Sequence, residues 1–262
     1  MRNDELREAF VTAPLFALGE INLTYTDVDR GLVGGIMPGE SPITLPTHKE
    51  LAADYFCQRR EAGVINIGGS GRIHVDGEIY AMENKDSLYI AKESKAIEFY
   101  SDDISNPAKF YLVSYPAHRV TKTVHVPKSK AQTIDLGSQA TSNERTIFQS
   151  IRPGIVDSCQ LVMGITELKP GSVWNTKPPH THFRRTEIYM YFDLPEDERV
   201  FHLMGEPKEV RSLSLPKEVA IASPMWSIHS GVGTTNYTFV WAMGGENQEF
   251  DDMDHIQVSD LK

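Results

Sequence analysis

The amino-acid sequence predicts an all-β protein with two β-barrel domains and short helices at the N-terminus. The first indication is a series of short apolar stretches between residues 63 and 115, which recur about every ten residues. Strands of this length and spacing are typical of a sandwich or a barrel. The second indication is a polar connector at about 127–141, after which a second series of apolar stretches begins. Two barrels in tandem therefore account for the 262 residues.

In the first half, helices are expected only before residue 57. Residues 4–10 and 49–56 have the apolar spacing of a helix, although both segments are short. The dipeptide Asp76-Gly77 separates two apolar segments and predicts a β-hairpin. The expected strands cover residues 22–26, 32–38, 64–67, 72–75, 78–82, 87–91, 96–100 and 109–115.

The first strand expected in the second half is a long apolar segment at 159–168, which ends at the turn 169–171. The remaining expected strands cover residues 187–192, 200–204, 218–222 and 237–243. We expect an N-terminal arm and a first barrel over 1–135, and a second barrel over 136–262.

The composition argues against several classes of function. The net charge of −10 makes nucleic acid and anionic membrane surfaces poor partners. No apolar run approaches the length of a membrane helix, and residues 1–5 lack the character of a signal peptide. The two cysteines, Cys57 and Cys159, lie far apart in sequence and need not pair. These features favour a reduced, cytoplasmic protein that acts on a small molecule.

Four residues of the second half form the pattern of a metal site. His180 and His182 are two residues apart, so on a strand both side chains point to the same face. The short polar link 184–186 can return the chain and bring Glu187 beside them, and His229 completes the set from a distant segment. Three imidazole nitrogens and one carboxylate suit Zn²⁺, Mn²⁺, Fe²⁺ or Ni²⁺. The histidine pair alone is a weak signal, since such pairs occur in strands by chance.

The spacing of these residues resembles the two metal motifs of the cupin superfamily. The first motif is HxH-x4-E at 180–187, and the second is P-x4-H at 224–229. Trp226 and Gly233 stand where the second motif usually has Gly and Asn, and the closing Gly of the first motif is missing. These departures fall in turns rather than at the ligands. The first half has no HxH pair and no matching carboxylate, and its His74 and His118 are lone histidines. We therefore expect it to be a degenerate, metal-free cupin domain and the second half to bind the metal.

A closer resemblance runs from about residue 30 to the C-terminus. Its blocks resemble the 5-keto-4-deoxyuronate isomerase family and lie at 34–38, 63–69, 107–111, 141–147, 168–176, 226–233 and 245–255. The resemblance implies a bicupin of two double-stranded β-helix barrels that assembles into a hexamer in the bacterial cytoplasm. It also implies one zinc ion per subunit, with ligands at the positions His180, His182, Glu187 and His229. The implied reaction of pectin and uronate breakdown converts 5-dehydro-4-deoxy-D-glucuronate into 3-deoxy-D-glycero-2,5-hexodiulosonate.

An aldose–ketose isomerase needs a proton carrier and a cation for the substrate carboxylate. The sequence offers several carriers, of which we favour Glu246, Tyr189 and Tyr191; the others are His202, Asp251 and Asp252. The tyrosines share strand parity with Glu187, but they are equally compatible with filling the barrel. Arg184 and Arg185 lie beside the ligands and are the expected carboxylate-binding residues; surface ion pairs are the alternative.

Two other functions are compatible with the metal pattern. An Fe²⁺-dependent cupin dioxygenase would use the same ligands and require oxygen. A non-catalytic sugar-binding or storage-type bicupin would require no metal. For the isomerase, acid–base side chains in the barrel favour proton transfer through an enediol over a hydride shift.

Overall fold

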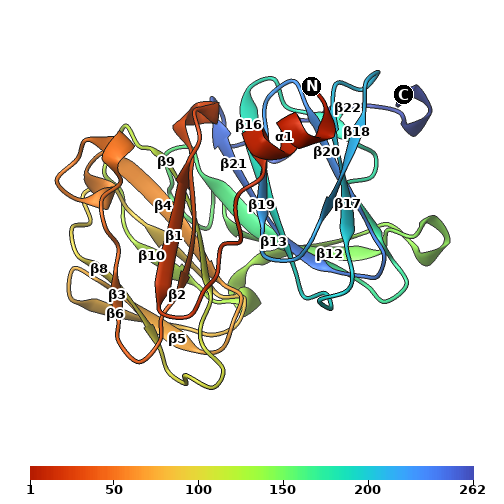
Figure 1. The fold of residues 1–262 in the computed structure, drawn as a ribbon. Coiled ribbons are helices and arrows are strands. Elements are labelled where there is room, and N and C mark those ends of the chain that lie inside the picture. The colour runs from red at the N-terminus through yellow and green to blue at the C-terminus, as the bar shows by residue number, and fades with distance from the viewer. The chain divides into compact units, whose positions relative to one another are not determined.

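The computed structural model describes residues 1–262, and most of its regular structure is β. It contains strands β1 to β22, one α-helix, α1 (Asn3–Phe10), and short 3-10 turns (Figure 1). The all-β prediction is therefore confirmed, and the helix expected over residues 4–10 is present as α1. No helix has the length and apolar character needed to cross a membrane.

The chain divides into two compact units that are not consecutive stretches of sequence. The N-terminal unit comprises Leu15–Ala131 and Ser150–Met163. The C-terminal unit comprises Met1–Pro14, Gln132–Gln149 and Gly164–Lys262. Relative to the expected division at 135/136, the first residues of the chain belong to the C-terminal unit, and a segment of the second half belongs to the N-terminal unit.

The N-terminal unit contains one six-stranded sheet, in the order β1-β2-β9-β4-β7-β10, and one four-stranded sheet, in the order β3-β8-β5-β6. The predicted hairpin forms between β5 and β6, where Asp76 and Gly77 both have positive φ. Buried apolar side chains from both sheets form its core. The strands are β1 (Glu20–Tyr25), β2 (Leu32–Met37), β3 (Ile43–Thr44), β4 (Arg60–Asn66), β5 (Gly71–Val75), β6 (Glu78–Met82), β7 (Ser87–Ile90), β8 (Ile97–Ser101), β9 (Phe110–Pro116) and β10 (Val124–Val126).

The C-terminal unit is built mainly on a six-stranded sheet, in the order β11-β12-β13-β21-β16-β19, and a four-stranded sheet, in the order β14-β20-β17-β18. A two-stranded ribbon, β15-β22, is added to them. The strands are β11 (Gln132–Leu136), β12 (Arg145–Ile151), β13 (Val162–Leu168), β14 (Trp174–Asn175), β15 (His180–Thr181), β16 (Arg185–Phe192), β17 (Val200–Gly205), β18 (Arg211–Leu215), β19 (Ala220–Ser223), β20 (Ile228–Gly233), β21 (Thr238–Gly245) and β22 (Asp254–His255).

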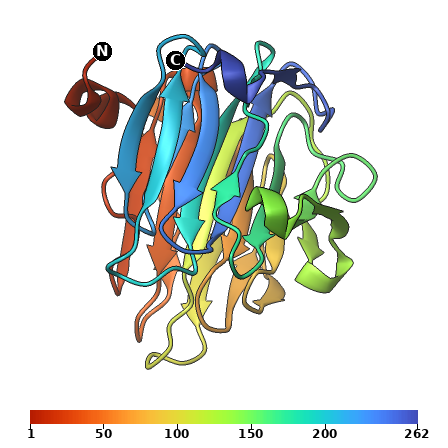
Figure 2. The same ribbon diagram turned by 90° about the vertical axis from the view of Figure 1, so that its right-hand side faces the viewer.

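The first residues of the chain form an arm on the C-terminal unit. Figure 2 shows α1, in dark red, at the edge of the cyan and blue strands, and its neighbours there are β18 and β19. Arg7 donates a hydrogen bond to the carbonyl of Ser214, and the amide of Thr12 donates to the carbonyl of Ala220. Leu6 is buried, so the arm is held by both apolar packing and hydrogen bonds.

The segment Ser150–Met163 is tied into the N-terminal unit by a buried carboxylate. Glu61, on β4, accepts hydrogen bonds from the backbone amides of Cys159, Gln160 and Leu161, at 2.6, 2.8 and 2.8 Å. The hydroxyl of Tyr89 donates a fourth at 2.7 Å. Because these three amides point at a side chain, they cannot pair with a strand. The strand expected from residue 159 therefore begins only at β13, Val162.

The helix expected over 49–56 was wrong. The chain forms two separate 3-10 turns there, η2 (Lys49–Leu51) and η3 (Phe56–Gln58). Ala52 adopts a left-handed conformation that ends η2, and Arg59 donates hydrogen bonds to the carbonyls of Leu51 and Ala52. These carbonyls are thereby satisfied without further helical turns.

Candidate metal centre and active site

Three strand regions bring the predicted ligands together. His180 lies on β15, and His182 follows directly after it. The amide of Arg185 donates to the carbonyl of His182, which closes a tight turn and starts β16, so that Glu187 returns to the histidine pair. His229 lies near the start of β20. The fold-back expected from the short polar link 184–186 is therefore present.

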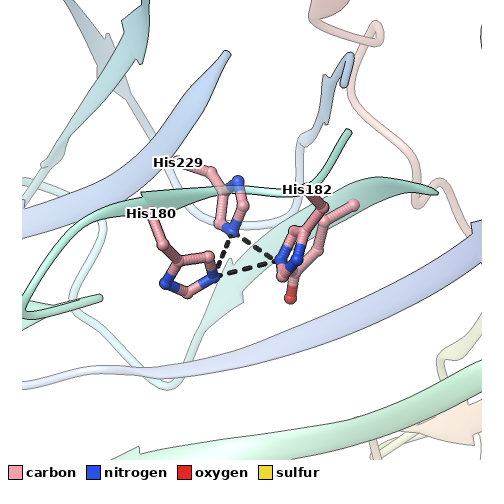
Figure 3. Close-up of side chains that lie close together, drawn as sticks. His180, His182 and His229 are labelled. Atoms are coloured by element: carbon pink, nitrogen blue, oxygen red, sulfur yellow. Dashed lines mark hydrogen bonds and ion pairs between the residues drawn. The ribbon is translucent and has the colours of Figure 1, made fainter. Parts of the chain in front are cut away.

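The four ligand atoms converge on one point. The Nε2 atom of His180 lies 3.0 Å from Nε2 of His182 and 3.0 Å from Nε2 of His229 (Figure 3). Oε2 of Glu187 lies 3.0 Å from Nε2 of His182 and 2.7 Å from Nε2 of His229. Two atoms bound to one cation at about 2.1 Å would be about 3.0 Å apart at a right angle and about 3.4 Å apart at a tetrahedral angle. The observed spacing is close to this range, so the residues fit a divalent metal ion.

The protonation states also suit a cation. Nδ1 of His182 donates to the carbonyl of Asp252 at 2.6 Å, which leaves Nε2 free to act as a ligand. Burial lowers the pKa of His180 and of His229, so both rings stay neutral. Burial alone would raise the pKa of Glu187, but His229 and His182 outweigh it and lower this pKa well below its usual value. Neutral imidazoles and an ionised carboxylate are the forms that bind metal.

A cavity of about 430 Å³ opens beside the ligands. Its volume lies within the ordinary range for small-molecule sites, about 300–1,000 Å³. His180, Glu187 and Tyr189 line one part of the wall. The remaining wall is a mixture of apolar and polar side chains, which include Ile147, Phe239, Trp241, Met243, Phe250, Met253, Asn143, Arg145, Thr166, Asn175, Lys177, Asp251 and His255.

The three favoured proton carriers lie in three different environments. Tyr189 lines the cavity, with its ring centroid 5.3 Å from that of His229 and its hydroxyl 2.7 Å from Oγ1 of Thr176. Tyr191 is buried elsewhere in the barrel, and its hydroxyl lies 2.7 Å from Nδ1 of His202. Glu246 is exposed and does not line the cavity.

The two arginines expected to bind the carboxylate lie outside the cavity wall and contact the C-terminal segment. Arg184 donates to the carboxylate of Asp252, whose pKa it lowers to about 2, and pairs with Asp254. Arg185 is 2% exposed and donates to the carbonyls of Glu249, Phe250 and Asp252. This segment supplies several cavity-lining side chains, so both arginines act on the cavity through its wall.

The sequence interpretation missed two cations of the cavity, Arg145 and Lys177. Arg145 lies at the start of β12, and Lys177 follows β14. Both lie within or beside blocks that carried the family resemblance, which was the available signal. The direction of their side chains depends on strand pairing that the sequence does not reveal.

Comparisons with known proteins identify the family of the chain. Residues 16–258 match the KduI/IolB family. Proteins named 4-deoxy-L-threo-5-hexosulose-uronate ketol-isomerase, from Lachnoclostridium phytofermentans and Formosa agariphila, are 52% and 51% identical to the chain. The alignments cover 99% and 98% of this chain and 94% and 92% of those proteins.

Solved structures share the fold at low sequence identity. An IolB-like protein from Salmonella typhimurium has a TM-score of 0.69 at 12% identity, covering 92% of this chain and 94% of that one. The oxalate decarboxylase of Lactobacillus farciminis has a TM-score of 0.60 at 10% identity, covering 91% and 83%. These likenesses support a cupin-like fold and carry no information about the reaction.

Proposed function

The chain belongs to the KduI/IolB family, and on this premise we propose that it is a ketol-isomerase of uronate catabolism. Its substrate is 4-deoxy-L-threo-5-hexosulose uronate, the open-chain acid named in its relatives. The product we propose is 3-deoxy-D-glycero-2,5-hexodiulosonate. The observation that carries the proposal is the buried set of three histidines and one glutamate, two of which line a cavity. A relative about half identical over nearly its whole length supports the same reaction.

The cofactor we propose is one Zn²⁺ per subunit, held by His180, His182, Glu187 and His229. When bound, a divalent cation polarises a carbonyl and stabilises the negative charge of an enediolate. The chain supplies the ionised carboxylate and neutral rings that hold the ion, and the carbonyl of Asp252 fixes the ring of His182.

The isomerisation requires a proton to leave the carbon that bears the hydroxyl and to reach the neighbouring carbonyl carbon. Tyr189 is the only favoured carrier that lines the cavity. Burial raises its pKa well above the usual value, so at neutral pH it keeps its proton and serves as a hydrogen-bond donor to a substrate oxygen. Asp251 and His255 also line the cavity and are the side chains that can accept a proton there.

The finer architecture follows the same premise. We infer a bicupin in which the C-terminal unit alone binds metal, a hexameric assembly, and a cytoplasmic location. The free state of Cys57 and Cys159 is compatible with a reducing compartment.

The function is tested by incubating the metal-loaded protein with the unsaturated-uronate breakdown product and following the aldehyde-derived NMR signals. We expect these signals to disappear without consumption of oxygen. In deuterated water, an enediol path with an exchanging base should place deuterium on the new CH₂OH carbon. Oxygen-dependent turnover would instead indicate a dioxygenase, and a protein without bound metal and without turnover would indicate a binding protein.

The metal assignment is tested by His180→Ala, which should lose most bound metal and activity because three ligands remain. The matched control is His118→Ala, since His118 is an exposed histidine of the N-terminal unit. It should keep full metal content. Full metal occupancy in His180→Ala would reject the site.

A further inference from the structure

Arg145 is a buried cation whose hydrogen-bonding capacity is largely unused. It is 7% exposed, begins β12 and lines the cavity of the metal site. Its Nη1 donates to the carbonyl of Asn143 at 2.9 Å, while its buried Nε has no partner. The ionisable groups that act on its pKa are Tyr189 and Tyr237, which are neutral phenols, and no carboxylate is among them. Arg145 therefore lacks a counter-ion.

The other buried arginines show how the fold normally satisfies such a group. Arg60 donates to the hydroxyl and the carbonyl of Ser114 and to the carbonyl of Arg30. Arg185 donates to three backbone carbonyls, so its guanidinium is largely satisfied although its Nε, like that of Arg145, has no partner. Burying a charge without compensating bonds costs several kcal/mol, so folds rarely keep one in this state. An arginine that keeps unpaired hydrogen-bond donors at a cavity wall can therefore donate them to a bound ligand.

We propose that Arg145 binds the carboxylate of the ligand in this cavity. The ligand class is a short open-chain acid whose far end, with its carbonyl and hydroxyl, reaches the metal ligands His180 and Glu187. Both of these residues line the same cavity as Arg145. A planar guanidinium suits a carboxylate because it can offer two parallel N–H donors. This inference rests on the proposed function for the identity of the acid as a uronate.

The other cations near the site are already engaged. Arg184 pairs with Asp252 and Asp254 and lies outside the cavity wall. Lys177 lines the cavity, but its Nζ donates to the carbonyl of Thr141 at 3.0 Å and lies 4.6 Å from the ring centroid of Trp174. Arg145 thus stands apart as the lining cation with a buried donor that has no partner.

The test compares two open-chain six-carbon probes, D-gluconate and D-glucitol, which differ in one carboxylate. Titration calorimetry on the metal-loaded wild-type protein should show gluconate binding about 10- to 100-fold more tightly, as expected for charge-assisted hydrogen bonds. Arg145→Met should abolish this preference, and Arg145→Lys should restore part of it. Lys177→Met, which removes another lining cation, should retain it. A preference that survives in Arg145→Met, or is absent from the wild type, would overturn the proposal.

Two further measurements separate ligand binding from a structural role. A ligand-free Arg145→Met protein should melt at the same temperature as the wild type or higher, because an uncompensated buried charge is removed. A clear fall in melting temperature would assign Arg145 to the fold instead. With the uronate substrate, KM should rise about 10- to 100-fold in Arg145→Met. If the wild type does not isomerise the uronate, the proposed function fails, while the gluconate preference still decides the role of Arg145.

Discussion

Replacing Arg185 should weaken metal binding, although Arg185 is not a ligand. Its guanidinium donates to the carbonyls of Glu249, Phe250 and Asp252, at 2.5, 3.1 and 3.1 Å. The carbonyl of Asp252 also accepts the Nδ1 proton of His182. Arg185 therefore holds the backbone group that orients His182, one of the proposed metal ligands.

The size of the effect follows from these bonds. A hydrogen bond from a charged donor contributes about 1.5–3 kcal/mol. Arg185→Met removes three of them, and Arg185→Lys, which lacks the fork, retains one at best. Removing the buried charge also removes its desolvation penalty, which offsets part of this loss. The contact between residue 185 and the C-terminal segment is still weakened by several kcal/mol. Loss of the partner of a ligating histidine typically costs 10- to 100-fold in metal affinity, and we expect this loss in Arg185→Met.

The assay is competition for zinc against a chromophoric chelator, combined with hydrogen exchange of residues 249–254. Arg185→Met should bind zinc 10- to 100-fold more weakly and exchange faster in this segment. The matched control is Arg184→Met, because Arg184 is partly exposed and its ion pairs contribute at most about 1 kcal/mol each. If Arg185→Met kept wild-type zinc affinity and only raised KM, Arg185 would be a substrate-binding residue, as the sequence suggested, and the anchoring argument would be refuted.

Three further predictions concern buried polar groups. Glu61→Gln replaces one acceptor oxygen by a donor and removes the charge, so the free energy of unfolding in urea should fall by about 1–3 kcal/mol; unchanged stability would show that the Glu61 bonds are energetically neutral. Burial raises the pKa of Cys57 to about 12, so iodoacetamide at pH 8 should modify Cys159 in the native protein and both thiols in urea. Native modification of Cys57 would contradict its burial. Burial lowers the pKa of His202 to about 3, so stability should decline as the pH falls from about 6.5 towards 3, because the unfolded chain gains a proton that the folded one cannot hold. His202→Asn should make this decline shallower by about 1.4 kcal/mol per pH unit, and an unaltered slope would show that His202 does not contribute.

The sequence was sufficient for those features that depend on spacing. His180 and His182 share a face because strand side chains alternate, and the short link after them allows the chain to return and bring Glu187 beside them. The hairpin at Asp76 and Gly77 depends on local conformation alone. Parity also placed both tyrosines of β16 inside the barrel, since Tyr189 and Tyr191 are buried.

Features that depend on distant partners were not predictable in this way. Residues 159–161 are apolar enough for a strand, but their amides bind Glu61, about one hundred positions earlier in the chain. The exposed position of Glu246 follows from the turn after β21, which local pattern does not reveal. For residues 159–161, a polar group far away in sequence therefore decides the local structure.

Sequence proximity and spatial proximity to the metal site differ among the arginines. Arg184 and Arg185 are adjacent to the ligands in sequence because the turn that brings Glu187 to His182 contains them, and this proximity made them candidates for the carboxylate. In the structure, however, both side chains contact the C-terminal segment. Arg145 enters the same cavity from β12, about forty residues earlier, with a donor still unpaired. In this protein the arginine next to the ligands in sequence contacts the segment that orients His182, whereas the residue proposed to bind the carboxylate comes from a distant strand.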